Sequence, residues 1–125
     1  MLIDTDVLIW LFRGRDSARK AIADALSVEL SAVTYMELVQ GMRNKLELQK
    51  LRRSIHEQRW SVLPISENIS HRACIYVENY ALSHGIRLAD ALIASTAAES
   101  GSTLMTANIK HYKVISEVSL MRFKP

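Results

Sequence analysis

The sequence lacks the residues on which several common kinds of site depend. Its one cysteine, Cys74, excludes an intramolecular disulfide and fits a reducing compartment. Because Cys74 lies in an apolar helical stretch, we expect it to pack in the core. The four histidines form no H-x₃-H pair, which argues against zinc. No G-x-S-x-G, Walker or G-x-G-x-x-G motif occurs, so nothing indicates a serine hydrolase, an ATPase or a dinucleotide-dependent enzyme.

Long apolar runs are also missing. None approaches the ~18 residues of a membrane-spanning helix, and Asp4 follows the start too closely for a secretory leader. Hydrophobic residues make up 49% of the sequence and charged residues 23%, with only two prolines, which is an ordinary folded composition. At 125 residues the chain is expected to be one domain, residues 1–125. We expect a soluble, cytoplasmic protein with no membrane partner.

Positive charge exceeds negative charge only slightly, with a formal net charge of +3. The excess is concentrated between Gly41 and Trp60, in Arg43, Lys45, Lys50, Arg52, Arg53 and Arg59. Glu47 and Glu57 interrupt this stretch. It suits either the solvated face of a helix or a surface that binds phosphate groups, and both interpretations stay open.

Short apolar runs alternate with stretches of helical periodicity. Strands are predicted over residues 2–3, 28–33, 62–65, 102–106 and 118–121. Helices are predicted over 7–12, 16–26, 34–42, 46–58, from a cap at Ser66 to Gly85, and over 88–98. Pro64 suggests an edge position for the third strand. Such alternation predicts a single three-layer α/β/α domain with a mainly parallel sheet.

Acidic and amide side chains follow several of these strands: Asp4, Glu37, Asp90 and Asn108. Asp4 closes the first strand, and Asn108 follows the strand that ends at Thr106. Glu37 and Asp90 occupy first turns of helices. In a parallel sheet these positions share the carboxyl edge, where ligands usually bind. Hard oxygen ligands select Mg²⁺ or Mn²⁺, and a metal in a basic protein suggests phosphate chemistry.

Each acid also has a structural alternative. Asp6 is a good N-cap residue for the first helix. Thr34 and Glu37 match a capping box, in which Glu37 returns to the backbone of Thr34. Asp90 suits the first turn of any helix. However, Asp90 and Asp4 lie among apolar residues, and a buried carboxylate is costly without a partner such as a cation.

The order and spacing of these segments resemble a PIN domain, specifically the small VapC-type toxin ribonucleases of bacterial toxin–antitoxin pairs. The resemblance runs along the whole chain. It is carried by residues 2–9 (LIDTDVLI), 31–34 (SAVT) leading to Glu37, 63–65 (LPI), 88–94 (LADALIA), 104–108 (LMTAN) and 111–112 (HY).

The resemblance implies a site and a mechanism. In that family, residues at the positions of Asp4, Glu37 and Asp90, with a fourth at Asn108, bind one or two Mg²⁺ or Mn²⁺ ions that cut RNA. The fourth residue is often aspartate. Asp6 would have a supporting or capping role, and the Thr106 hydroxyl would orient a ligand or phosphate. Metal-activated water would hydrolyse the phosphodiester bond.

The resemblance also implies partners. Large apolar residues near the acidic edge exceed what one helix face can bury, so a groove is expected there, with Trp10, Tyr35, Leu38 and Met42 among its residues. VapC-type toxins bind their antitoxin in such a groove and commonly form homodimers. Two other functions stay open: a weakly catalytic or non-catalytic nucleic-acid-binding PIN module that acts in repression with a partner, and a metal-dependent phosphatase for small molecules.

Overall fold

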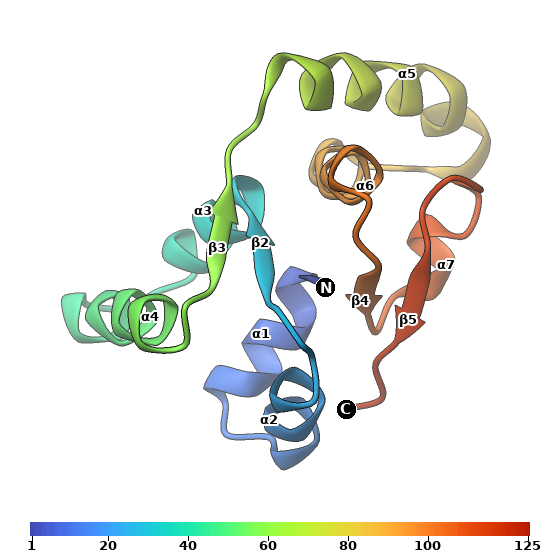
Figure 1. Cartoon of the computed structure of the whole chain (residues 1–125). Helices are drawn as coiled ribbons and strands as arrows, with labels where there is room; N and C mark the ends of the chain where they lie inside the picture. Colours follow the sequence, from blue (N-terminus) through green and yellow to red (C-terminus); the bar gives the residue numbers. More distant parts are fainter.

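Five short strands form a fully parallel sheet in the middle of the chain. The structure is a computed structural model that describes all residues, 1–125 (Figure 1). The strands are β1 (Leu2–Ile3), β2 (Glu29–Ser31), β3 (Ser61–Leu63), β4 (Leu104–Thr106) and β5 (Leu120–Arg122). Their order is β3-β2-β1-β4-β5, so β1 is central and β3 lies at an edge. The predicted parallel sheet and the edge position beside Pro64 are therefore confirmed.

Seven helices connect the strands. They are α1 (Thr5–Phe12), α2 (Asp16–Ala23), α3 (Ala32–Gln40), α4 (Lys45–Glu57), α5 (Glu67–His84), α6 (Leu88–Ser100) and α7 (Ile109–Tyr112). In Figure 1, α5 and α6 lie together on one side of the molecule, and α1 and α2 lie on the other. No helix combines the length and the apolar character needed to cross a membrane.

Alternating side chains of the two central strands divide the core in two. Leu2 and Leu104 pack in a cluster built largely from α5, α6 and the segment after α7. Their neighbours Ile3 and Met105 pack on the opposite face, in a cluster with α1, α2 and α4. Successive residues of a strand point to opposite faces of the sheet, and here both faces are covered. The three-layer α/β/α prediction is confirmed.

Several helix boundaries follow local capping chemistry. Asp4 caps α1, with its Oδ1 accepting from the Thr5 backbone N–H at 2.8 Å. Ser31 caps α3 in the same way, at 3.1 Å from the Val33 nitrogen. Ser66 caps α5, as predicted. Gly85 ends α5 with a φ of 67°, a left-handed conformation that favours glycine.

One core prediction and one helix boundary were wrong. Cys74 is exposed, because α5 buries the stripe Ile69, Ala73 and Tyr76, and Cys74 lies beside that stripe. The second helix was predicted to continue to residue 26, but α2 ends at Ala23, and Leu26 is fully exposed in the turn that follows.

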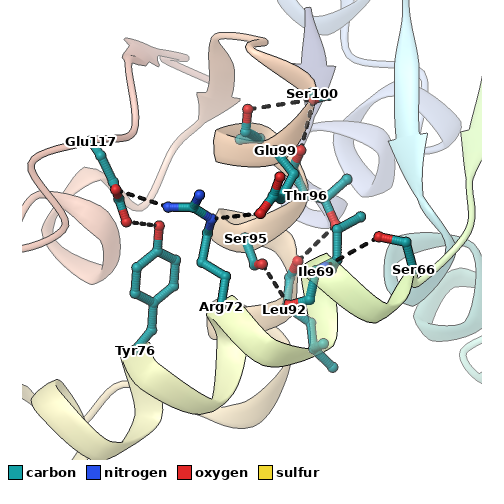
Figure 2. A network of polar contacts seen from close by, with 11 residues as sticks. Ser66, Ile69, Arg72, Tyr76, Leu92, Ser95, Thr96, Glu99, Ser100 and Glu117 are labelled. Carbon is teal, nitrogen blue, oxygen red and sulfur yellow. Dashed lines mark hydrogen bonds and ion pairs between the residues drawn. The ribbon is translucent and has the colours of Figure 1, made fainter.

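Polar contacts join α5 and α6 to the segment that follows α7 (Figure 2). The Arg72 guanidinium pairs with Glu99 of α6 at 3.1 Å and with Glu117 at 2.9 Å. The Tyr76 hydroxyl also donates to Glu117, and the buried Ser95 hydroxyl donates to the Ile69 carbonyl at 2.6 Å. Partly exposed ion pairs contribute modestly to stability. Their geometric effect is to fix the segment next to Tyr112 against α5.

Candidate acidic site

The acidic site is built where β1 and β4 end side by side. Asp4 follows β1, and its backbone N–H donates to the Met105 carbonyl at 2.9 Å. Thr106 ends β4, and its hydroxyl donates to Asp4 Oδ2 at 2.8 Å. The Asn108 backbone N–H then donates to the Thr106 hydroxyl oxygen at 3.0 Å. Asp4 and Thr106 are buried, so parallel pairing brings together residues about a hundred positions apart, as the sequence predicted.

Asp6 does not cap α1, which corrects the N-cap interpretation. Asp4 is the cap residue, and Asp6 lies in the first turn of the helix. Asp6 Oδ2 accepts from the Ala107 backbone N–H at 3.0 Å and from Asn108 Nδ2 at 2.9 Å. Its second oxygen, Oδ1, is buried and has no hydrogen-bond partner. Asp6 therefore joins α1 to the turn after β4.

Glu37 reaches the same region from α3, but not through a capping box. Because α3 begins at Ala32 with Ser31 as its cap, Thr34 lies inside the helix and cannot be the cap residue. Glu37 Oε1 instead accepts from the Thr5 hydroxyl at 2.7 Å. The buried Thr34 hydroxyl lies 3.0 Å from the same Thr5 oxygen. Glu37 itself is exposed.

Asp90 enters from the first turn of α6. Its Oδ2 accepts weakly from the Arg87 backbone N–H at 3.4 Å. On its other side, the Tyr112 hydroxyl lies 3.5 Å from Oδ1. Tyr112 is 1% exposed, and it lies close enough to Asp4 for each group to shift the pKa of the other. Asp90 and Asp4 thus both lie near the side chain of Tyr112.

Tyr112 is the site residue to which sequence reasoning assigned no role. It lies on α7, a helix of only four residues that was not predicted. A periodic signal needs more residues than one turn contains. The available signal was spacing: Tyr112 follows Asn108 by four residues, which is one turn of helix.

Burial raises the pKa of the Asp4 carboxyl to about 6, and the neighbouring charge of Asp6 adds to this increase. The hydrogen bond from Thr106 acts in the opposite direction. Burial also raises the pKa of Asp6, although the Ala107 N–H offsets part of the effect. Tyr112 has a strongly raised pKa because of its burial and the charge of Asp4, so its hydroxyl remains a donor.

The residues present fit a hard divalent cation in chemistry and charge. The side chains of Asp4, Asp6, Glu37, Asp90, Thr106 and Asn108 supply oxygens to the site, His111 lies close enough to affect the pKa of Asp6, and Asp6 Oδ1 is buried without a hydrogen-bond partner. No lysine or arginine forms a salt bridge with Asp4, Asp6, Glu37 or Asp90. No three of the acidic groups lie close enough together in this structure to hold one ion. The Thr5 and Tyr112 hydroxyls stand between them.

A groove between α1, α3 and α4 begins at Glu37. Its apolar residues are Ile9, Phe12, Leu38, Met42 and Leu51, and it also contains the basic Arg13, Arg43 and Lys50. Of the four residues predicted for a partner groove, Leu38 and Met42 line it. Trp10 instead packs against Arg15, whose guanidinium carbon Cζ lies 4.5 Å from the centroid of the Trp10 ring. Tyr35 lines a separate hollow with Arg52, Arg59 and Trp60.

Comparisons with known proteins agree with this arrangement. The family model described as "PIN domain" matches residues 1–116. Ribonuclease VapC10 of Mycobacterium tuberculosis is 34% identical over 124 residues, covering 94% of this chain and 90% of the relative. A toxin–antitoxin complex from Klebsiella pneumoniae contains a chain 30% identical, with a TM-score of 0.78 and coverage of 94% and 93%. VapBC-1 of nontypeable Haemophilus influenzae, at 22% identity, TM-score 0.82 and coverage of 98% and 96%, shows the same fold.

The raised pKa of Asp4 predicts how stability depends on pH without divalent metal. With a pKa of 3.8 unfolded and about 6 folded, the folded state binds the proton more tightly. Ionisation therefore lowers the free energy of unfolding as pH rises between those values, by up to about 3 kcal/mol. In EDTA, Asp4→Asn should be more stable than the parent above pH 7 and lose this advantage near pH 4. Urea unfolding measures the difference. An advantage independent of pH, or one shared by the exposed control Asp24→Asn, would contradict the electrostatic cause.

Removing the Tyr112 hydroxyl should raise the pKa of Asp4 further. A hydroxyl donor near Asp4 favours the ionised carboxylate and lowers its pKa, and Tyr112→Phe removes that hydroxyl while keeping the ring. Carboxyl ¹³C chemical shifts followed through a pH titration report the pKa directly. Tyr80→Phe is the matched control, because Tyr80 belongs to α5, is only partly buried, contacts His84 and forms no hydrogen bond with an acid. An unchanged Asp4 pKa in Tyr112→Phe would show that the hydroxyl does not reach Asp4.

Proposed function

Because the chain belongs to the PIN-domain family, we propose that it is an Mg²⁺- or Mn²⁺-dependent endoribonuclease and the toxin of a toxin–antitoxin pair. The observation that carries the proposal is the group of acids around Asp4, none of which forms a salt bridge with a lysine or arginine. The VapC10 relative, named a ribonuclease, matches nearly the whole chain.

Asp4, Glu37 and Asp90 are the residues that would hold the cation. When bound, a divalent cation stabilises charge that develops on a phosphate and lowers the pKa of water. The protein's own contribution is orientation. The Thr5 N–H and the Thr106 hydroxyl fix the two oxygens of Asp4. A carboxylate held in this way loses little conformational freedom on binding an ion.

Glu37 and Asp90 are held less firmly than Asp4. Glu37 is exposed and accepts one hydrogen bond, from the Thr5 hydroxyl. The contacts of Asp90 are long, at 3.4 and 3.5 Å. Both carboxylates would therefore give up few hydrogen bonds on binding a cation. We propose that these two complete the catalytic site while Asp4 anchors it.

The groove that begins at Glu37 is where we propose the cognate antitoxin binds. Its apolar floor favours a segment with apolar side chains. A basic side chain at the end of that segment would meet the uncompensated acids and compete with the cation. By resemblance we also propose a homodimer, which the molar mass in solution would test.

Replacing each proposed ligand should abolish RNA cleavage. Asp4→Asn, Glu37→Gln and Asp90→Asn keep side-chain size and remove charge, so cleavage should fall by more than about 100-fold with the fold intact. Cleavage is measured on a panel of cellular RNAs with Mg²⁺, Mn²⁺ or EDTA, and melting curves report folding. Glu47→Gln is the control, because Glu47 pairs with Arg43 outside the acidic cluster. Cleavage that persists in EDTA, or in all three variants, would overturn the proposed mechanism.

A charge placed in the groove should release the toxin from its antitoxin without affecting catalysis. Ile9 is 38% exposed and lines the groove, so Ile9→Glu should weaken binding of the antitoxin's C-terminal part by more than about tenfold while RNA cleavage continues. Leu82→Glu introduces the same charge on the exposed face of α5 and should bind normally. Calorimetry measures both affinities. Equal affinity of the two variants would place the antitoxin on another surface.

A further inference from the structure

The side chains of Asp6 and Asn108 form one unit at the acidic edge. Asn108 Nδ2 donates to Asp6 Oδ2 at 2.9 Å, and the Asn108 backbone N–H donates to Thr106. Thr106 in turn donates to Asp4 Oδ2. A continuous path of hydrogen bonds therefore connects Asp6 to Asp4 through Asn108 and Thr106. In this path Asn108 acts twice as a donor.

The negative charge of this unit lies on Asp6. Its Oδ2 accepts two hydrogen bonds, but its Oδ1 is buried and accepts none. A buried carboxylate oxygen without a partner is costly, since it has lost water and gained nothing in return. Native structures rarely retain such a group without a reason, and an absent ion is one of the usual reasons.

Asn108 is less suited to hold a cation by itself. It is neutral, and its amide nitrogen is already committed to Asp6. That hydrogen bond fixes which oxygen of Asp6 is occupied and leaves the other one free. An amide that donates to a carboxylate in this way orients it, as partners behind metal ligands commonly do.

We propose that Asp6, through Oδ1, is the fourth carboxylate ligand of the site and that Asn108 is the positioning residue that holds it. This inference rests on the proposed metal-dependent function. The competing interpretation is that Asp6 only fastens α1 to the turn after β4. Both interpretations use the same hydrogen bonds. The experiment therefore has to separate the negative charge of Asp6 from its hydrogen bonds to Ala107 and Asn108.

Exchanging the two side chains achieves this separation. Asp6→Asn keeps an oxygen in the place of Oδ2, which can still accept from the Ala107 N–H and from the Asn108 amide. Both hydrogen bonds are therefore kept and only the charge is lost. The double variant Asp6→Asn/Asn108→Asp again has one carboxylate and one amide, with the carboxylate now at position 108. Asn108→Asp alone replaces the Asn108 amide donor with a carboxylate that repels Asp6. Without metal this variant should therefore melt at a lower temperature than the parent.

Titration calorimetry with Mn²⁺ on the full chain is the measurement. Asp6→Asn should bind Mn²⁺ at least about tenfold more weakly, and the exchanged double variant should recover to within about threefold of the parent. Asp24→Asn, an exposed acid at the end of α2, is the control and should be unchanged. Melting in EDTA should leave Asp6→Asn as stable as the parent or more stable, because an unpaired buried charge has gone.

Normal Mn²⁺ affinity in Asp6→Asn would overturn this inference and leave the metal-dependent function standing. No Mn²⁺ binding by the parent chain would overturn the metal-dependent function as well. If Asp6→Asn fails to fold, Asp6→Ser serves as the second variant, since its hydroxyl still accepts from the Ala107 N–H. It should show the same loss of affinity, and normal affinity there would equally refute the inference.

Discussion

Parallel pairing of β1 with β4 sets Leu2 opposite Leu104 and Ile3 opposite Met105. This register decides which residues meet beyond the ends of the two strands. Asp4 and Asp6 on one side then face Thr106, Ala107 and Asn108 on the other. A slip of one residue would turn each of these side chains to the opposite face of the sheet. The buried layers on both faces prevent such a slip, so the hydrophobic core fixes the polar site.

The acids are held mainly by hydroxyl and backbone N–H donors, and no lysine or arginine forms a salt bridge with them. Thr5, Thr106 and Tyr112 each direct a hydroxyl at a carboxylate. Such donors orient an acid without cancelling its charge, whereas an arginine would do both. The site therefore keeps a negative potential that a folded protein would normally avoid. The raised pKa of Asp4 comes first from its burial and then from the charge of Asp6 beside it.

The order of elements and the shared edge of Asp4, Glu37 and Asp90 were predictable, because strand-to-helix alternation and a parallel sheet leave few arrangements. Local hydrogen-bond partners were not. The Thr34 and Glu37 spacing matched a capping box, yet α3 begins earlier because Ser31 is the better placed cap. Asp6 was likewise interpreted from its neighbours in sequence, as a cap. Its side chain in fact pairs with Asn108, about a hundred residues away. Short-range patterns cannot reveal a contact made possible by tertiary pairing.

The position of β4 in the chain has a consequence for synthesis on the ribosome. Strand β1 and its aspartates emerge first, but their neighbours on β4 begin only at Leu104. Contacts so distant in sequence form late, since the intervening chain must be ordered before they are made. A growing chain therefore carries Asp4 and Asp6 without their partners until Thr106, Ala107 and Asn108 have been synthesised. Until then the nascent chain on the ribosome has no assembled acidic site.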